Sequence, residues 1–404
     1  MLTGKRILLG IAGGIAVYRV AELARMLKKA GADVRCVMSR SATEFVTPLT
    51  FEALTGEAVH HHLFDLTSER EMGHIKLARW ADAVILAPAT ASLLARLAHG
   101  IADDLLSTLM LVCDKPVLLA PAMNTSMWES AATQRNMATL KQRGMACVGP
   151  AHGTLACGEK GAGRLADLNA IIASLMPLLT EQSLRGQAWL INAGPTHEAW
   201  DGVRLLSNRA SGKLGLLLAE QASMRGANVT LIAGPGTPIT HTAMHRIDIE
   251  SAADMLKACQ QYAAGIDVFI GSAAVSDYRF AHRQTEKLKR ADTANLSVQL
   301  EANPDIIAHI ASMENRPTTI IAFAAESSNH IAYARNKLQH KKVDAIVAND
   351  IHNMGSDQAG GWWITNGDEK NIKRSTKAAF ANHIIDHVID HITDHTIDHF
   401  TESL

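Results

Sequence analysis

The sequence predicts an α/β protein with two doubly wound domains in tandem, each built on a mainly parallel sheet. One observation is the length of 404 residues, which exceeds one ordinary domain. Another is a pattern that occurs twice: strand, glycine-containing loop, helix and second strand, from Ile7 to Met38 and again from Ala188 to Ala233. Strands and helices that alternate in this way form parallel sheets covered on both faces, as in Rossmann-like and flavodoxin-like folds.

The first half opens with an apolar strand, a turn at Gly13-Gly14 and a helix over about Ile15 to Ala30. The apolar run before Pro121 is typical of a buried parallel strand that a proline ends. The strands expected in this half are Ile7–Gly10, Val34–Met38, Ala83–Ala87 and Val117–Ala120.

The second half restarts with a strand, the loop Gly194–Thr196 and a helix over Lys213–Arg225. Gly360–Asp368 is expected to be a strand that enters a tight Asn-Gly turn. Loops of small or polar residues follow most of the strands and hold most of the candidate chemistry. The other strands expected are Ala188–Ala193, Val229–Ala233, Val268–Gly271, Thr319–Phe323 and Ala345–Ala348.

The point at which the pattern restarts sets the domain boundaries. We expect a first domain over residues 1–180, a polar linker over 181–187, a second domain over 188–380 and a tail over 381–404. A histidine recurs at every fourth residue of this tail, and histidines four apart on a helix could chelate a metal. We favour a solvated terminal helix. The segment 60–62, three histidines, is expected to be an exposed loop, and metal ligands are left unassigned.

Composition limits the classes of function. Hydrophobic residues make up 47% and charged residues 20% of the chain, which fits well-filled cores. The formal net charge of -1 argues against nucleic-acid or membrane-surface binding through bulk charge. The five scattered cysteines lack metal-ligand spacing and fit a reducing compartment. The chain starts directly with a strand, and no apolar run approaches the ~20 residues of a membrane helix. We therefore expect a soluble, cytoplasmic protein.

Three segments carry the candidate chemistry of the first domain. Pro121 to Trp128, with the sequence PAMNTSMW, follows a buried strand at the edge where α/β sheets bind ligands. The others are Gly73-His74-Ile75 and Ala156-Cys157-Gly158, the latter within Leu155–Leu165, which we expect to be a mobile loop or flap. Together they resemble the flavin-dependent cysteine decarboxylases. The cysteine is typical of the branch of that family that makes 4'-phosphopantetheine for coenzyme A.

The resemblance implies an FMN site. Two adjacent glycines let the backbone approach a phosphate at the N-terminus of the following helix. Their spacing is not the GxGxxG of NAD sites, and Ala12 stands where the family usually has a hydroxylated residue. The residues assigned to FMN are Gly13, Gly14, Ser39, Thr43, Phe45, Ala87, Pro88, Ala89 and Thr90.

Decarboxylation of a cysteinyl amide needs an electron sink beside the carboxylate. Hydride transfer from the CH2–SH group to flavin gives a thioaldehyde, from which CO2 can leave to form an enethiolate. The resemblance implies that His74 is the base in the oxidation and that Asn124 orients the carboxylate. Cys157 would then protonate the enethiolate while the reduced flavin returns its hydride, so the overall reaction is redox-neutral.

A series of short segments runs through the second half: Ala193–Thr196, Ser207-Asn208, Ser211–Lys213, Ala273–Tyr278, Glu286–Lys289, Asn303–Ile306, Phe323–Glu326 and Ala348–Asp350. Their order and spacing, over roughly residues 187–375, resemble the phosphopantothenate–cysteine ligase domain. This resemblance implies that CTP and Mg2+ activate 4'-phosphopantothenate as an acyl-cytidylate, which cysteine then attacks. Asn208 would position the carboxylate or the acyl-cytidylate. Lys287 would offset charge in the transition state. His197 departs from the family pattern, whereas Asp201 and Arg204 keep it.

The side chains assigned to CTP include an aspartate for the ribose or base, a phenylalanine for the cytosine and lysines for the phosphates. They are Ser272, Ala273, Ala274, Asp277, Lys287, Pro304, Asp305, Ile306, Ile307, Phe323, Lys337 and Lys341. Without the motif order, Lys287 and Lys289 would be interpreted as parts of a solvated basic loop.

The function expected is thus CTP-dependent ligation of 4'-phosphopantothenate with cysteine, then FMN-dependent decarboxylation to 4'-phosphopantetheine. An alternative is a flavoprotein decarboxylase whose second domain is inactive or regulatory. A non-enzymatic flavin-binding partner protein fits less well, because His74, Asn124 and Cys157 occur together. A flavin prenyltransferase fits less well, because it would need neither the PxMN segment nor a ligase domain. The family resemblance also implies a homo-oligomer of trimers or their multiples, with subunits meeting around the flavin.

Overall fold

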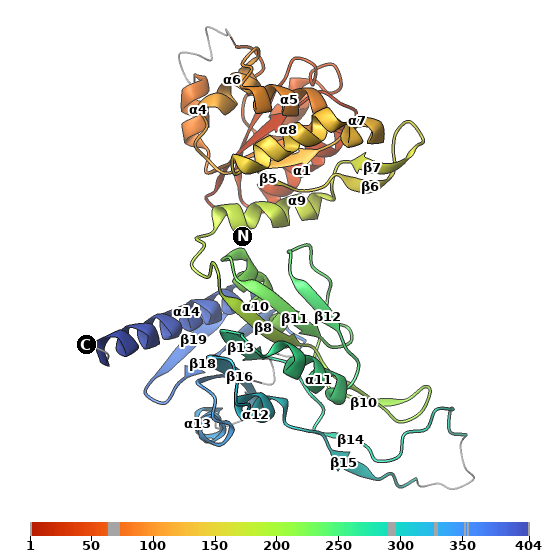
Figure 1. The fold of residues 1–404 in the computed structure, drawn as a ribbon, viewed down its shortest axis with the longest axis vertical. Coiled ribbons are helices and arrows are strands. Elements are labelled where there is room, and N and C mark those ends of the chain that lie inside the picture. The colour runs from red at the N-terminus through yellow and green to blue at the C-terminus, as the bar shows by residue number, and fades with distance from the viewer. Residues whose placement is uncertain are drawn as a thin grey trace. The chain divides into compact units, whose positions relative to one another are not determined.

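The computed structural model describes residues 2–63, 73–289, 296–326, 330–350, 353 and 355–402. The chain divides into two compact units, Met1–Glu181 and Gln182–Leu404. Each unit contains a mainly parallel sheet with helices packed against it (Figure 1). The predicted α/β class with two such sheets is therefore confirmed. No helix in the described part of the chain is both long and apolar enough to cross a membrane.

The sheet of unit 1 has five parallel strands in the order β2-β1-β3-β4-β5. Strand β2 lies on one side of β1, and β3, the next strand along the chain, lies on the other side of β1. In open α/β sheets, ligands bind at the carboxyl ends of the strands where the order reverses in this way. The strands are β1 (Arg6–Ile11), β2 (Asp33–Met38), β3 (Ala83–Ala89), β4 (Val117–Pro121) and β5 (Ala146–Cys147).

The helices of unit 1 bury apolar stripes against this sheet. In α1, Val17, Val20, Ala24 and Leu27 recur at helical spacing and are all buried. A hairpin of β6 (Ala151–Thr154) and β7 (Lys160–Arg164) lies outside the main sheet. The helices are α1 (Val17–Lys29), α2 (Pro48–Thr55), α4 (His74–Trp80), α5 (Ala91–His99), α6 (Leu105–Val112), α7 (Thr125–Glu129), α8 (Ala131–Gln142), α9 (Leu168–Leu175) and the 3-10 helix η1 (Met176–Leu179).

The main sheet of unit 2 has eight strands in the order β12-β11-β8-β13-β16-β17-β18-β19. The pairs up to β17 are parallel, and β18 and β19 are antiparallel additions. The strand order reverses between β8 and β13. The strands are β8 (Ala188–Ala193), β11 (Asn228–Ala233), β12 (His245–Asp248), β13 (Val268–Gly271), β16 (Thr319–Glu326), β17 (Ala345–Asp350), β18 (Gln358–Ile364) and β19 (Glu369–Thr376).

The predicted strand at Gly360 is part of β18, and the Asn366-Gly367 turn joins β18 to β19. In the described part of unit 2, the remaining elements are five helices and two small antiparallel sheets. They are α10 (Lys213–Met224), α11 (Ala252–Tyr262), α12 (Ile306–Ala311), α13 (His330–Lys341), α14 (Lys377–Glu402), β9 (His197–Ala199) with β10 (Leu205–Ser207), and β14 (Tyr278–Phe280) with β15 (Leu300–Ala302).

The prediction of a solvated tail from residue 381 was wrong for its first half. Helix α14 already begins at Lys377, and Ile384, Ile385 and Val388 are fully buried in the core of unit 2. The reason is that apolar residues recur at helical spacing between the histidines and aspartates, so the helix has an apolar stripe. His387 stacks against Trp363 at 5.7 Å between ring centroids.

The segment 60–62, predicted to be an exposed loop, is one only in part, since His62 is exposed whereas His60 is paired. His60 extends the pairing of β2, since its N–H donates to the Cys36 carbonyl and its carbonyl accepts from the Met38 N–H. Among the residues that the structure describes, no group of three or more His, Cys, Asp and Glu side chains could hold a metal ion.

Candidate functional site

Unit 1 has a cavity of about 790 Å³ at the carboxyl ends of its central strands. Segments that follow β1, β3 and β4 line it, together with the β6–β7 hairpin. The cavity thus lies where the strand order reverses, as the topology requires. Of the residues assigned to FMN or catalysis, those that line it are Gly13, Gly14, Pro88, Thr90, Asn124 and Cys157.

The glycine turn after β1 is required by close packing. A Cβ added at Gly13 would overlap the backbone and side chain of Ser41, whereas one at Gly14 would meet Thr90 Cγ2 at an ordinary 3.6 Å. Residue 13 must therefore be glycine if Ser41 is to reach the cavity. Ser41 lines the cavity and was missed, because one serine in a loop carries no distinctive signal.

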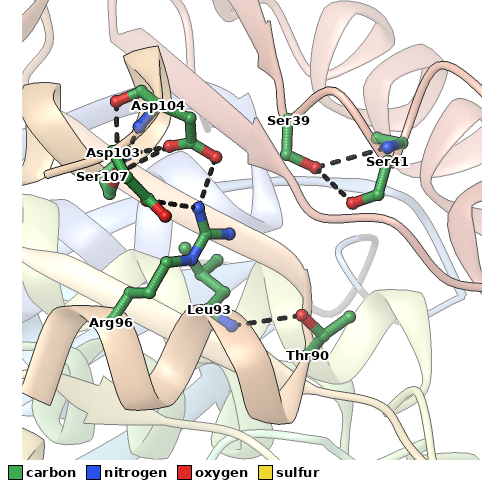
Figure 2. Close-up of polar contacts among 9 residues, drawn as sticks. Ser39, Ser41, Thr90, Leu93, Arg96, Asp103, Asp104 and Ser107 are labelled. Carbon is green, nitrogen blue, oxygen red and sulfur yellow. Dashed lines mark hydrogen bonds and ion pairs between the residues drawn. The ribbon is translucent and has the colours of Figure 1, made fainter. Parts of the chain in front are cut away.

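The other polar groups assigned to FMN lie mainly behind this wall. Ser39 is 2% exposed, and its hydroxyl lies 3.2 Å from that of Ser41 (Figure 2). Thr43 donates its hydroxyl proton to the Arg40 carbonyl at 2.7 Å. The Phe45 side chain is 50% exposed and, like Ala87 and Ala89, does not line the cavity of its own chain.

Thr90 lines the cavity and caps helix α5. Its hydroxyl oxygen accepts a hydrogen bond from the Leu93 N–H at 3.3 Å (Figure 2). The oxygen is thereby fixed at the helix N-terminus, where a threonine is a favoured N-cap. Its hydroxyl proton remains able to donate to a ligand in the cavity.

Arg96 is a cation in the cavity wall that the sequence did not indicate. Its guanidinium donates to Asp103 at 2.9 Å and to Asp104 at 2.6 Å (Figure 2). The hydrogen bond from Arg96 is the main reason that the pKa of Asp103 lies below its usual value. Asp104 and Ser107 also form the capping box of α6. The charge of Arg96 is therefore already balanced by two carboxylates.

Asn124 and Cys157 are brought together at this cavity. The side-chain oxygen of Asn124 accepts from the Ser126 N–H at 2.8 Å, which caps α7 and fixes the side chain. Its amide group donates to Glu159 at 2.7 Å and to the Cys157 sulfur at 3.5 Å. The Glu159 carboxylate therefore lies where Asn124 would hold the carboxylate of a substrate. Glu159 is a further residue that the sequence did not single out.

The segment 155–165, predicted to be a loop or flap, is a turn over its first residues and a strand over the rest. Residues Lys160–Arg164 form β7, which packs against α7. A Cβ at Gly161 would overlap Thr125, and one at Gly163 would overlap the Met123 carbonyl. The glycines thus allow close packing of a strand, while Cys157 lies exposed in the turn that precedes it.

His74 is not part of this cavity in the same chain. It is the first residue of α4, is half-buried, and does not line the cavity with Asn124 and Cys157. Helix α4 packs against α6. Met72, which precedes the Gly73-His74-Ile75 motif, lies outside the described residues.

Unit 2 has a smaller cavity of about 200 Å³, also at the carboxyl ends of the strands. Ser272, Ala273, Ala274 and Phe323, all assigned to CTP, line it. Asn192 at the end of β8 holds this segment, because its side-chain oxygen accepts from the Ala273 N–H at 3.0 Å. The start of α10 and the residue Lys377 form another part of the wall.

Asn208 lies next to this cavity with its amide protons engaged. Its side-chain nitrogen donates to the carbonyls of Ala274 at 3.0 Å and Val275 at 3.1 Å. The amide oxygen is therefore the group left for a ligand, and it accepts hydrogen bonds. This arrangement favours contact with a donor group over contact with the carboxylate that the sequence suggested.

The remaining residues assigned to CTP do not line the cavity. Asp277 and Lys287 are exposed, and the loop of Lys287 is held by Asp201, whose carboxylate accepts from the Leu288 N–H at 3.1 Å. Asp305 caps α12 and forms an ion pair with Lys341 at 3.0 Å. The others that lie outside the wall are Pro304, Ile306, Ile307 and Lys337, of which Ile306 is buried in the core.

Asp201 shows how that loop is fixed. Burial raises the pKa of its carboxyl, but hydrogen bonds from the N–H groups of Val203, Arg204 and Leu288 lower it more, and the net shift is downward. An ionised carboxylate with three backbone donors therefore joins the turn after β9 to the Lys287 loop.

Comparison with known proteins matches each unit to a family. Residues 1–180 match the family described as Flavoprotein, and residues 184–392 match the DNA/pantothenate metabolism flavoprotein C-terminal domain. The coenzyme A biosynthesis bifunctional protein CoaBC of Vibrio vulnificus is 46% identical over 95% of this chain and 97% of its own. The CoaBC of Escherichia coli is 44% identical over 87% of each chain. A crystal structure of the C-terminal domain of a CoaBC covers 53% of this chain and 100% of that domain, with 32% identity and a TM-score of 0.46.

Proposed function

The chain belongs to the family of coenzyme A biosynthesis bifunctional proteins CoaBC, and on that premise we propose which residues and cofactors carry its two reactions. It is a bifunctional enzyme with a flavoprotein decarboxylase domain and a ligase domain. We assign FMN and Cys157 chemistry to unit 1 and CTP chemistry to unit 2. The observation that carries the proposal is the contact of Asn124 with Cys157 beside the Gly13-Gly14 turn.

The order of the reactions follows from their chemistry. Unit 2 would couple 4'-phosphopantothenate to cysteine by way of an acyl-cytidylate, and unit 1 would decarboxylate the product to 4'-phosphopantetheine. The described residues lack a cluster of ligands for a metal ion. Mg2+ would therefore enter with the phosphates of CTP, as this ion usually binds through few protein ligands.

In unit 1, Gly13, Gly14 and Thr90 would help to hold the flavin, which would supply hydride-transfer chemistry at the substrate carbon that bears the thiol. Asn124 would hold the substrate carboxylate with the N–H that now donates to Glu159. Cys157, on the same side of the cavity, would donate a proton to the enethiolate carbon. Glu159 must move aside when a substrate carboxylate binds.

FMN fits the unit 1 cavity, whose wall is closely packed where Gly13 meets Ser41. We expect the purified protein to be yellow, with about one FMN per chain, because the cavity combines apolar walls with a few fixed polar groups. Gly13→Ala should lower bound flavin severalfold, since its Cβ would displace Ser41. Flavin absorbance after gel filtration measures this.

The control for that experiment is Gly367→Ala, because a Cβ at this glycine meets nothing within 4 Å and its turn is in unit 2. It should keep its flavin. A folded, colourless wild-type protein that takes up no added FMN would contradict the assignment of unit 1.

We also propose that the decarboxylase site is shared between copies of the chain. His74 is absent from the cavity of its own chain, so a catalytic His74 must act in the cavity of another copy. Exposed apolar side chains at the cavity rim, Ile15 and Tyr18, and on the packed helices α4 and α6, Ile75 and Leu111, are suited to such a contact. Two different surfaces that pair between copies form a closed ring when the rotation between neighbouring copies closes, and we propose a trimer as that ring.

Mixing two inactive variants tests this arrangement. His74→Asn should abolish flavin reduction, and Cys157→Ser should block the last step. If each site combines His74 of one copy with Cys157 of the next, hetero-oligomers from an equal mixture should regain about a quarter of the sites. Formation of 4'-phosphopantetheine measures this recovery. A mixture that assembles but stays inactive would place both residues of a site in one chain.

A further inference from the structure

The side-chain nitrogen of Asn124 is fully engaged by two residues of the β6–β7 turn. It donates to the Glu159 carboxylate at 2.7 Å and to the Cys157 sulfur at 3.5 Å. The orientation of this amide is fixed, because its oxygen accepts from the Ser126 N–H. An amide nitrogen has two protons, so a substrate carboxylate can bind here only by replacing one of the two partners.

Glu159 is the partner that a substrate carboxylate replaces. Both groups are carboxylates that accept a charge-assisted hydrogen bond from the same nitrogen, and two negative charges so close together repel each other. Glu159 is exposed and does not line the cavity, so its side chain can turn toward solvent without leaving a buried charge. Cys157 lines the cavity, where its proton would be needed.

Glu159 and Cys157 belong to one hydrogen-bonded turn beside α7 (Figure 1). The Leu155 N–H donates to the Glu159 carbonyl at 2.8 Å, and the Gly158 N–H donates to the Leu155 carbonyl at 3.0 Å. Gly158 closes the turn in the left-handed conformation, with φ of 88°. The hydrogen bond between Asn124 and Glu159 therefore holds the whole turn, and Cys157 with it, against the start of α7.

We propose that Glu159 is a positioning residue, which releases Asn124 when the substrate carboxylate binds and returns to it after CO2 has left. This inference rests on the proposed function. The decarboxylated intermediate has no carboxylate, so it does not compete with Glu159 for Asn124. The restored hydrogen bond brings the turn back against α7, and Cys157 is then in place to donate its proton. Glu159 thus weakens substrate binding and speeds the last step.

Calorimetric titration of the full-length FMN-bound protein tests the release of Glu159. The probe is 4'-phosphopantothenoylserine, which carries the substrate carboxylate but has a hydroxyl in place of the thiol. A hydroxyl is a far weaker acid than a thiol, so the probe binds without being oxidised. Glu159→Ala should tighten its binding by about three- to tenfold, because no internal carboxylate has to be displaced. The same probe with ethanolamine in place of serine has no carboxylate, and its binding should not change.

Mass spectrometry of a single turnover tests the return of Glu159. With 4'-phosphopantothenoylcysteine, Glu159→Ala should still reduce flavin and release CO2. It should form 4'-phosphopantetheine about tenfold more slowly than the wild type, so that the enethiol accumulates, because Cys157 is no longer held in place.

Two further variants control both measurements. Glu159→Gln keeps an oxygen that accepts from Asn124, so it should complete the reaction without accumulating the enethiol. Glu129→Ala removes an exposed carboxylate of α7 that does not line the cavity, and it should behave as the wild type does.

The outcomes separate this inference from the proposed function. If the wild type does not convert 4'-phosphopantothenoylcysteine to 4'-phosphopantetheine, the decarboxylase assignment fails and the inference is overturned with it. If the wild type converts the substrate, but Glu159→Ala shows unchanged affinity for the serine probe or no accumulation of the enethiol, the assignment stands and the inference alone is overturned. Tighter binding of both probes would also overturn it, because an exchange of carboxylates cannot affect the probe that has none.

Discussion

Replacing Cys157 by serine is expected to leave flavin reduction and CO2 release intact while it stops the formation of 4'-phosphopantetheine. The oxidised enethiol should accumulate, because a serine hydroxyl is a far weaker acid than a thiol and does not donate the proton that completes the reaction. Mass spectrometry of the product measures the outcome, since the enethiol is two hydrogens lighter than 4'-phosphopantetheine.

The position of Cys157 explains why the loss should be confined to the last step. The thiol is exposed in the turn between β6 and β7 and contacts Asn124 without being part of the core. Serine is nearly the same size, so the hairpin and the Asn124 contacts should persist. Cys147→Ser replaces a half-buried thiol of unit 1 that does not line the cavity, and it should complete the reaction. Normal turnover to 4'-phosphopantetheine in Cys157→Ser would refute the assigned role.

The sequence predicted the sheets well because each strand and helix has its own local signal. Apolar runs that alternate with helices predict parallel strands. Gly13 and Pro121 mark the ends of strands directly in the sequence. The start of α14 was missed for a different reason. Its apolar stripe lies between histidines and aspartates whose regular spacing dominates the pattern, and only packing against the sheet shows that Ile384 is core.

The two sites differ in how much of each could be predicted. In unit 1, the loops that follow successive parallel strands meet at one edge, so short motifs such as the one around Asn124 point directly to the cavity. In unit 2, Lys213 and Lys377 are far apart in the sequence and meet only because α10 and α14 pack together. Charged side chains that only tertiary packing brings together leave no local pattern in the sequence. The Ser-Gly-Lys segment at the start of α10, in contrast, was a local signal that could have pointed to the cavity.

Lys287→Gln is expected to slow the CTP half-reaction strongly while the fold stays intact. Negative charge builds at the α-phosphate during acyl-cytidylate formation, and loss of one preorganised charged contact commonly costs about 10²–10³ in rate. Lys287 is exposed, and among the described residues its ammonium has no partner, so it is available to a ligand. Its loop is nevertheless fixed, because the buried Asp201 carboxylate accepts from the Leu288 N–H and Arg204 donates to the Leu288 carbonyl.

Release of pyrophosphate from CTP, measured with 4'-phosphopantothenate before cysteine is added, isolates this half-reaction. The control is Lys257→Gln, an exposed lysine on α11 outside the cavity, which should react at the wild-type rate. If Asp201 positions the lysine, Asp201→Asn should reduce the rate too, but less than Lys287→Gln, because the side chain could still reach the phosphates from a looser loop. An undiminished rate in Lys287→Gln would mean that this lysine is only part of a solvated loop, and ATP consumption without CTP consumption would refute the nucleotide assignment itself.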